Sequence, residues 1–245
     1  MLSTNTLAPN GISNAAPWQT MASAGLPDPT WGHTYVTDFD TFNAADWTIT
    51  RVGTGTQALT PFDGGALLLT NSAGATDSAF FQLVNASFKL LPPHETFFKF
   101  AGMLSDVVNC VFYCGLLATT VTPFTPGDGV YILKATGQAG LTLNVVIGGV
   151  TTSFPFPASV VLVANTYFEL GLHMTITGGV EAFFNPTTGH IPPQPPAGAV
   201  RGYATQIPAP ATGLTQVLLN PSFGLLNSTA VGRTLTTDYV VASRC

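Results

Sequence analysis

Short runs of β-branched and aromatic residues alternate along most of this chain with residues that favour turns. The pairs Gly64-Gly65, Gly148-Gly149 and Gly178-Gly179 mark three of these turns, because glycine readily adopts the positive φ that tight hairpins require. No comparable stretch repeats apolar residues at the spacing of an α-helix. The pattern therefore predicts an all-β chain.

Residues 167–177 show the strand pattern most clearly. One face would carry Phe168, Leu170, Leu172, Met174 and Ile176, and the other Tyr167, Glu169, Gly171, His173, Thr175 and Thr177. This alternation is typical of a sheet with one face on a core and the other in water. Because neither long helices nor crossovers separate the runs, we expect a two-sheet antiparallel β-sandwich.

The expected sandwich domain covers residues 34–245. We expect strands near 34–39, 47–51, 57–62, 66–70, 78–88, 96–104, 110–119, 129–135, 141–147, 151–156, 167–177, 180–185, 216–226 and 233–241. Residues 1–33 have no sustained period and contain several prolines, so we expect an extended N-terminal arm. Trp18 and Trp31 are its large side chains, and the arm is either a loose tail or a strap that orders against a neighbouring subunit.

Residues 185–213 interrupt the strand pattern with a concentration of prolines. Proline cannot donate to a sheet ladder, so we expect a long surface excursion that is partly polyproline-like. Such a stretch could act as a peptide-like ligand, as a contact arm within an assembly, or as a plain loop. We assign contacts with a partner to the following residues of the arm and the excursion: Trp18, Trp31, Pro192, Pro193, Pro195, Pro196 and Tyr203.

The three cysteines do not predict a disulfide framework, because their number is odd. On a strand, Cys110 and Cys114 would lie on one face about 13 Å apart, beyond the reach of a disulfide. We expect them to be buried thiols and Cys245 to be exposed. No second Cys or His pair lies at the spacing of a zinc site.

The acidic residues form no recognisable catalytic pattern. Glu95, Glu169 and Glu181 are isolated in the sequence, unlike the closely spaced carboxylates of laminarinase-type sandwich glycosidases. The four histidines also stand alone, apart from the adjacent His94 and Glu95, and no Gly-x-Ser-x-Gly motif occurs. We therefore expect no catalytic residues, no cofactor and no metal, and hence a protein that is not an enzyme.

One acidic patch leaves an alternative open. Asp38, Asp40 and Asp46 lie close together in the sequence, and they could contribute oxygen ligands to calcium or close an ordinary turn.

Charge is scarce in this chain. Only 8% of its residues are charged, against about 25% in a typical globular domain, while 35 residues are Thr and 17 are Phe. The net charge of -5 and the scattered Lys and Arg residues argue against nucleic acid or an anionic membrane as a partner. Interfaces in permanent assemblies are depleted in charge and rich in aromatic residues, so the composition favours a structural subunit of a large assembly.

The chain start shows no targeting signal. Residues 1–10 contain no Lys or Arg and no continuous apolar run, so we expect a protein that is made and kept in a cytosol rather than secreted.

Two short segments resemble those of a known group of proteins. The segment Asp38-Phe-Asp-Thr-Phe-Asn-Ala-Ala-Asp-Trp47 resembles the first strands of jelly-roll and concanavalin-like sandwiches, and Thr237-Asp-Tyr-Val-Val-Ala-Ser-Arg244 resembles their last strand. Such pairs of segments bracket many virion proteins of tailed bacteriophages. The resemblance implies a capsid cement or decoration protein on the outside of the major capsid protein shell, and with it a virion location. We also expect a homo-oligomer (dimer or trimer), because copies of the chain could cover its charge-poor surface.

Two alternatives stay open beside the capsid role. The first is a carbohydrate- or receptor-binding virion domain on the same fold, which needs exposed aromatic rings. Trp47, Tyr113, Tyr131 and Tyr203 are candidates for these rings, although Trp47 and Tyr113 also fit a core. The second is a divergent polysaccharide hydrolase, which needs the fold to bring two isolated carboxylates together.

Overall fold

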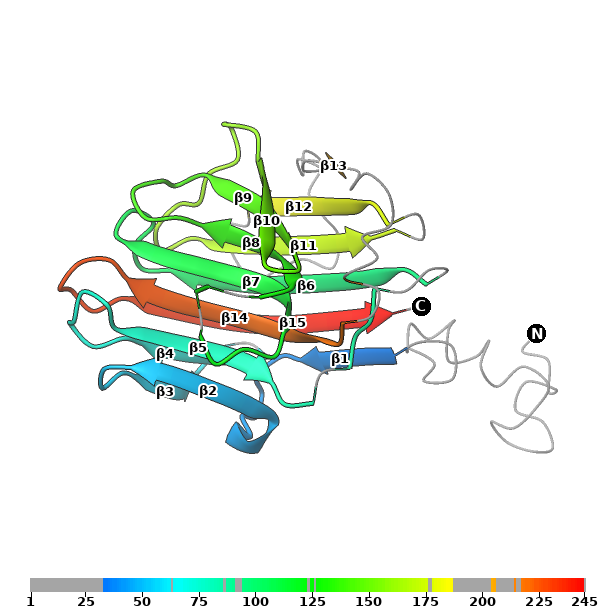
Figure 1. Ribbon diagram of the computed structural model, residues 1–245. Helices are drawn as coiled ribbons and strands as arrows, with labels where there is room; N and C mark the ends of the chain where they lie inside the picture. The colour runs from blue at the N-terminus through cyan, green and yellow to red at the C-terminus, as the bar shows by residue number, and fades with distance from the viewer. Residues whose placement is uncertain are drawn as a thin grey trace, which may run out of the picture.

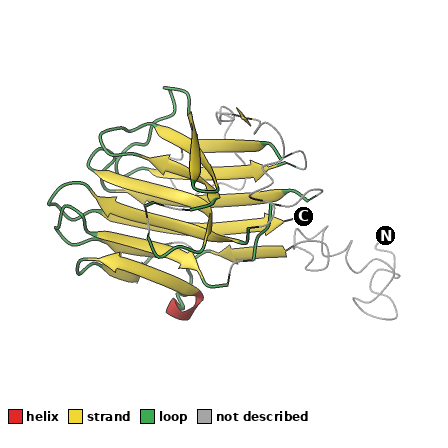
Figure 2. Ribbon diagram, in the orientation of Figure 1, coloured by secondary structure: helices red, strands yellow, loops and turns green. Residues whose placement is uncertain are grey.

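The alternating pattern of residues 167–177 forms strand β11 (Tyr167–Met174), which lies inside one of two large antiparallel sheets. The computed structural model describes residues 33–62, 64–85, 87–90, 94–122, 124–125, 127–175, 178–186, 204–205, 214 and 217–244. Over these residues the two sheets pack face to face, as Figures 1 and 2 show, which confirms the expected two-sheet antiparallel β-sandwich.

Fourteen of the strands match the segments expected from the sequence, and one further strand, β13, was not expected. The other strands are β1 (His33–Thr37), β2 (Trp47–Val52), β3 (Thr56–Thr60), β4 (Ala66–Thr70), β5 (Ser78–Leu83), β6 (Thr96–Leu104), β7 (Cys110–Ala118), β8 (Gly129–Lys134), β9 (Leu141–Ile147), β10 (Val150–Pro155), β12 (Val180–Pro186), β13 (Ala204–Thr205), β14 (Leu219–Asn227) and β15 (Thr234–Arg244). A single 3-10 turn, η2 (Ala44–Asp46), precedes β2.

The strand order defines the two sheets. Sheet A runs β13-β12-β11-β6-β15-β4-β3, with β1 also paired to β15, and sheet B runs β10-β9-β8-β7-β14-β5-β2. The first and last described strands are therefore neighbours in sheet A. No helix in the described part of the chain is long and apolar enough to cross a membrane.

Aromatic rings from both sheets meet in the core around Phe223 on β14. Its ring stacks on Phe81 of β5 at 5.2 Å between centroids and lies 5.6 Å from Phe100 of β6, in the opposite sheet. Trp47 contacts the same ring edge-on at 5.4 Å and is only 6% exposed, so the core interpretation of Trp47 is confirmed. Cys110 and Cys114 are buried free thiols on β7, as expected.

Several predicted strands end earlier than the sequence suggested, among them 57–62 at Thr60 and 167–177 at Met174, and for two others the backbone shows the reason. The segment near 34–39 ends as a strand at Thr37, since Phe39 turns the chain with a φ of 56° and buries its ring. The segment near 78–88 ends at Leu83, and Asn85 has a φ of 67°. In both cases a non-glycine residue in the left-handed region marks a turn that the hydrophobic pattern conceals.

Strand β13 is also a correction to the expected excursion at 185–213. Its two residues pair with β12, through Val180 with Thr205 and Glu181 with Ala204. Part of this proline-rich stretch therefore adds to the edge of sheet A.

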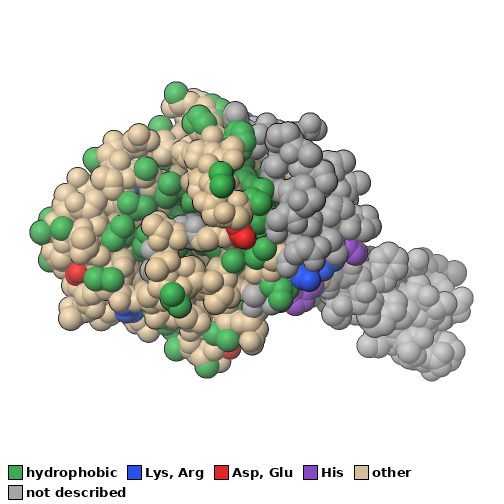
Figure 3. All heavy atoms as spheres, viewed as in Figure 1, with side chains coloured by type: hydrophobic (Ala, Val, Ile, Leu, Met, Phe, Trp, Pro, Cys, Tyr) green, Lys and Arg blue, Asp and Glu red, His purple; other side chains and the backbone are tan. Residues whose placement is uncertain are grey.

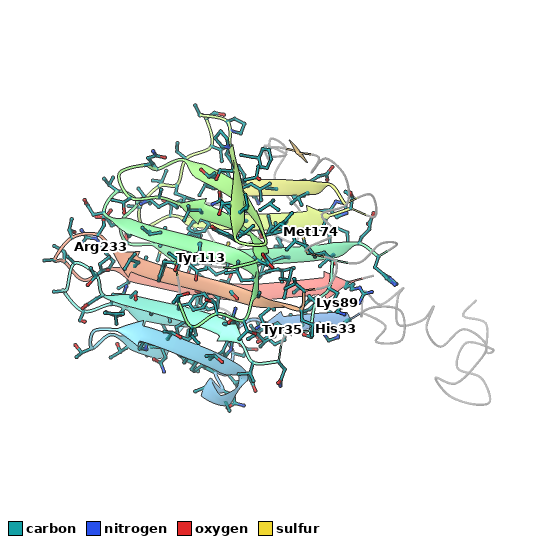
Figure 4. All side chains as sticks on the ribbon, viewed as in Figure 1. His33, Tyr35, Lys89, Tyr113, Met174 and Arg233 are labelled. Carbon is teal, nitrogen blue, oxygen red and sulfur yellow. The ribbon has the colours of Figure 1, made fainter. Side chains whose placement is uncertain are left out.

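The outer face of sheet B is closed over by the connection between β7 and β8, which Figure 1 shows in front of β14 and β5. Phe124 of this connection packs edge-on against Tyr113 at 5.0 Å between centroids. Gly224 lies beneath it, and a Cβ there would approach Phe124 Cζ to 3.3 Å. Thr120 N–H donates to Gln82 Oε1 at 3.0 Å. Tyr113, which Figure 4 places near the middle of the sheet, is therefore buried.

Candidate functional site on the outer face of sheet A

The polar face of β11 points away from the core, and the register of sheet A aligns its residues with those of four other strands. His173 lies opposite Glu181 on β12 and opposite Phe97 on β6. Phe97 in turn lies opposite Ser243 on β15, which lies opposite Thr34 on β1. We call Glu181, His173, Phe97, Ser243 and Thr34 the cross-strand row. At about 4.8 Å between strands, the row spans about 19 Å.

Phe97 and His173 form the centre of this row. Their rings are parallel within 4° and their centroids are 4.4 Å apart. Phe97 remains 39% exposed, although aromatic side chains in a sandwich usually face the core. The stack lies next to Met174, which Figure 4 places towards the same end of the sandwich as His33. The result is a partly exposed aromatic platform on the outer face of sheet A, where the next row along the strands also carries Phe183, Val241 and the exposed Val36.

Two carboxylates flank the imidazole of His173. Glu181 Oε2 lies 3.1 Å from Nδ1, and Glu95 Oε2 lies 3.3 Å from Nε2. The contact with Glu181 meets hydrogen-bond geometry, whereas Nε2 has no aligned partner despite its closeness to Glu95. The two carboxylates are 39% and 38% exposed. Their remaining oxygen lone pairs can accept hydrogen bonds from a ligand.

A second polar cluster lies farther along β11, beyond Gly171. Glu169, with a side chain only 8% exposed, accepts hydrogen bonds from Lys99 Nζ at 2.9 Å, from Asn185 Nδ2 at 2.9 Å and from the Tyr239 hydroxyl. The Lys99 ammonium also lies 5.2 Å from the centre of the Tyr239 ring. Three protein donors occupy most of the acceptor capacity of this buried carboxylate, so we assign it a structural role.

Burial and hydrogen bonding act in opposite directions on Glu169. Burial tends to raise the pKa of its carboxyl, but the hydrogen bonds from Tyr239, Asn185 and Lys99 outweigh burial and hold the pKa below the ordinary value. For Tyr239, burial raises the pKa of the hydroxyl, and the hydrogen bond to the Glu169 carboxylate raises it further. The pair therefore holds an ionised carboxylate against a neutral phenol.

The residues to which the sequence analysis assigned partner contacts lie outside the described residues. These are Trp18, Trp31, Pro192, Pro193, Pro195, Pro196 and Tyr203. The arm (1–33) is described only at His33, and Cys245 is also outside the described part.

The aromatic candidates for ligand binding that the structure does describe are not exposed. Trp47, Tyr113 and Tyr131 are 6%, 1% and 6% exposed. The exposed ring is instead Phe97, which the sequence analysis did not single out.

The acidic patch closes a turn in the structure. The Asp38 carboxylate accepts a hydrogen bond from the Asp40 N–H at 3.4 Å, and Asn43 caps η2 through the Ala45 N–H. Among the described residues, no three His, Cys, Asp or Glu side chains gather in a way that could hold a metal ion.

The cluster around His173 was missed because its members are far apart in the sequence. The hairpin between β11 and β12 did offer a signal, since the Gly178-Gly179 pair marks its turn. A two-residue turn at these glycines would pair His173 with Phe184, whereas the structure pairs His173 with Glu181. The contact between His173 and Glu181 was therefore not predictable from the glycine pair, because the actual register of the hairpin differs from that of a two-residue turn.

The geometry supports two kinds of chemistry. A half-exposed ring with carboxylates beside it can bind a pyranose, because the C–H groups of the sugar suit the negative ring face and its hydroxyls donate to carboxylates. An imidazole hydrogen-bonded to a carboxylate is also the pair that general-base catalysis uses.

No protein-family model matches the sequence, and no curated protein matches it. Solved structures do match. The Lotus tetragonolobus seed lectin has a TM-score of 0.56 at 9% identity, covering 87% of this chain and 98% of that one. The endo-1,3-β-glucanase from Streptomyces sioyaensis has a TM-score of 0.55 at 12% identity, covering 89% and 98%. The fold is the concanavalin-like β-sandwich.

A protein of bacteriophage origin has the same fold. The carbohydrate esterase from the Shiga toxin-encoding bacteriophage phi24B matches with a TM-score of 0.51 at 10% identity, covering 86% of this chain and 96% of that one. The concanavalin-like part of the resemblance is thus confirmed, whereas no comparison identifies a capsid protein. At these identities the likeness shows a shared fold.

The expectation that the protein is not an enzyme was wrong, because the fold does not exclude an enzyme. The sandwich that this chain adopts is also the fold of a glucanase and of a carbohydrate esterase. The missing sequence motif did not justify the prediction, since the fold brings a histidine and two carboxylates together that are isolated in the sequence.

Proposed function

We propose that this chain is a carbohydrate-binding domain that holds an oligosaccharide along the cross-strand row. The observation that carries the proposal is the stack of the partly exposed Phe97 ring on His173, whose imidazole contacts a carboxylate at each nitrogen. A sugar ring would lie against Phe97, and its hydroxyls would donate to Glu181 and Glu95. The row continues to the Ser243 and Thr34 hydroxyls, which lie 2.9 Å apart and can hydrogen-bond to a further sugar unit.

The fold is compatible with this proposal. A seed lectin, a glucanase and a phage carbohydrate esterase share the sandwich. The outer face of sheet B, in contrast, is closed by Phe124 and its neighbours, so sheet A offers the accessible aromatic ring.

The test is a glycan array followed by calorimetry with the best ligand. Phe97→Ala should weaken binding by about tenfold or more, which corresponds to at least about 1.4 kcal/mol. Leu59→Ala removes another exposed apolar side chain, at the far edge of sheet A, and should leave the affinity unchanged. Release of reducing ends from the same ligand would show whether binding leads to hydrolysis. If no glycan binds, or if Phe97→Ala binds normally, the proposal fails.

The capsid decoration role is a second candidate, favoured by the neutral surface. The face in Figure 3 shows hydrophobic side chains among neutral ones and few charged groups. Val121, Val150 and Val36 are 87%, 70% and 58% exposed.

On this proposal the chain is a virion component, made in the host cytoplasm, that binds the major capsid protein. It should co-sediment with tailed-phage capsids that lack a decoration protein, and removal of residues 1–33 should weaken attachment. A failure to co-sediment would exclude this role and leave the glycan proposal standing.

A further inference from the structure

One long stretch of the sequence, which contributes an exposed edge of the sandwich, contains no charged residue; the carboxylate at its turn belongs to Asp128, which accepts a hydrogen bond from the Gly149 N–H at 3.3 Å. No Asp, Glu, Lys, Arg or His lies between Lys134 and Glu169, a stretch that includes β9, β10 and the connection to β11. Val150, Val161 and Val163 within it are 70%, 42% and 58% exposed. Exposed strands in soluble proteins usually carry charges that prevent pairing with other molecules. Their absence here calls for an explanation.

Strand β10 is the edge strand of this stretch. It ends the strand order of sheet B, pairs with β9 alone among the described strands, and is exposed at Val150, Thr151, Thr152 and Ser153. Figure 1 shows that it crosses in front of β8 and β9. One of its two hydrogen-bonding sides is therefore open over the described residues.

The hairpin geometry identifies which backbone groups are open. Ile147 and Val150 flank the Gly148-Gly149 turn and form its closing hydrogen-bonded pair. The Phe156 N–H donates to the Leu141 carbonyl at 2.9 Å, which fits the same alternation six residues farther along. Along an antiparallel strand, the backbone N–H and C=O groups of every second residue point to the same side. Those of Val150 point to β9, so those of Thr151 and Ser153 face away from it.

We propose that β10 is an interface at which two copies of this chain associate, with the two β10 strands antiparallel about a two-fold axis at Thr152. Thr151 then pairs with Ser153 of the second copy, and Ser153 with Thr151 of the second copy. Each pair exchanges two backbone hydrogen bonds, and every donor needed is present. The pairing joins the two B sheets into one continuous sheet.

The absence of charge from β10 and the order of its residues both favour a second copy of this chain as the partner. At a two-fold axis each residue faces its own counterpart or a near neighbour, so any charge in the strand would meet a like charge. The uncharged sequence removes this repulsion. Val150 would face Phe154 of the second copy, an apolar pair across the strands. Pro155 has no N–H to donate outward, which limits the ladder to the residues before it.

The first test is the molar mass in solution, measured by light scattering over a range of concentrations. The unmodified chain should have twice the chain mass at high concentration. Thr152→Lys should bring two ammonium groups together at the axis and weaken dimerisation by about tenfold or more. Thr48→Lys adds the same charge at an exposed threonine on β2, the opposite edge of sheet B, and should leave the dimer intact.

A second test follows the geometry directly. Thr152 would form a non-hydrogen-bonded pair across the axis, with Cα atoms about 4.5 Å apart, which is within disulfide reach. In a Cys245→Ser background, Thr152→Cys should give a covalent dimer on mild oxidation, whereas Thr48→Cys should not. The proposal is overturned if the unmodified chain is a monomer at every concentration, or if Thr152→Lys leaves the dimer intact. Loss of the dimer in Thr56→Lys, on the edge strand β3, would assign the interface to sheet A and also overturn it.

Discussion

The imidazole of His173 lies parallel to the ring of Phe97, with 4.4 Å between their centroids, although the two residues belong to different strands. The stack places a partly exposed aromatic ring on the outer face of sheet A, beside an imidazole that contacts the carboxylates of Glu181 and Glu95 and in the same row as the hydroxyls of Ser243 and Thr34. This combination of an exposed ring with acceptors underlies the proposed carbohydrate site.

Substitution of Glu181 should separate binding from stability. Its carboxylate is 39% exposed and contacts a partly exposed imidazole, so Glu181→Gln should change the free energy of unfolding by less than about 1 kcal/mol. Binding of the best glycan should weaken by about tenfold, because a charged acceptor becomes a neutral amide. Urea unfolding and calorimetry on the same samples measure both effects. Asp40→Asn, at another exposed carboxylate, is the control and should change neither.

Substitution of Glu169 should have the reverse effect. Glu169→Ala leaves the Tyr239 hydroxyl and the Asn185 amide without their shared acceptor, and we expect a loss of about 3 kcal/mol in urea unfolding. Lys99→Met should cost less than about 1 kcal/mol, since the lysine side chain is 49% exposed. Equal losses in the two variants would contradict this assignment.

The lowered pKa of Glu169 also predicts an acid-dependent stability. The unfolded chain binds this proton more readily than the folded chain does, so the stabilisation is present above the unfolded pKa of about 4.3. It is lost as the pH falls through the folded pKa. The free energy of unfolding should therefore decrease below about pH 5, and the decrease should be smaller in Glu169→Gln. An unchanged pH profile in Glu169→Gln would refute the role of this carboxyl.

Two partly buried tyrosines predict a limit to stability at alkaline pH. Burial, with a smaller contribution from Asp46, raises the pKa of Tyr35 to about 12, and burial with Asp238 raises that of Tyr167 to about 12. Because an unfolded tyrosine ionises near pH 10, their stabilisation is complete below about pH 10 and is lost as the pH rises towards 12. Tyrosinate absorbance should rise together with the loss of circular dichroism. Ionisation of these tyrosines near pH 10 in a folded chain would contradict the prediction.

Two glycines inside strands should respond in opposite ways to alanine. A Cβ at Gly115 would lie 2.3 Å from the Val130 carbonyl oxygen and 2.5 Å from Tyr131 Cα, both backbone atoms, whereas a Cβ at Gly171 meets nothing closer than 3.6 Å. Gly115→Ala should destabilise the protein by about 3 kcal/mol or more. Gly171→Ala should be neutral or stabilise it by up to about 1 kcal/mol. Thermal unfolding of the two variants provides the comparison, and a tolerated Gly115→Ala would contradict the sheet packing.

The fold was largely predictable because each strand carries its own local signal. The alternation in residues 167–177 predicts β11 whichever strands lie beside it, and the glycine pairs mark the turns. Trp47 fitted a core from its residue type alone. The exceptions, Phe39 and Asn85, depend on a left-handed backbone in residues other than glycine, which the hydrophobic pattern does not reveal.

The candidate site was less predictable because it depends on register and strand order. Residues Phe97, His173 and Ser243 meet only because β6 lies between β11 and β15, and nothing local to these residues specifies that order. A shift of one residue in a single strand would turn its part of the row towards the core. From the sequence, His173 is therefore only an isolated residue on a polar strand face.

Amide hydrogen exchange with and without the best oligosaccharide tests the proposed site most directly. The account predicts that bound sugar slows exchange in the parts of β6, β11 and β12 that contain Phe97, His173 and Glu181, and that Phe97→Ala abolishes this protection at the same ligand concentration. Protection confined to sheet B, or binding that leaves these three strands unprotected, would contradict it.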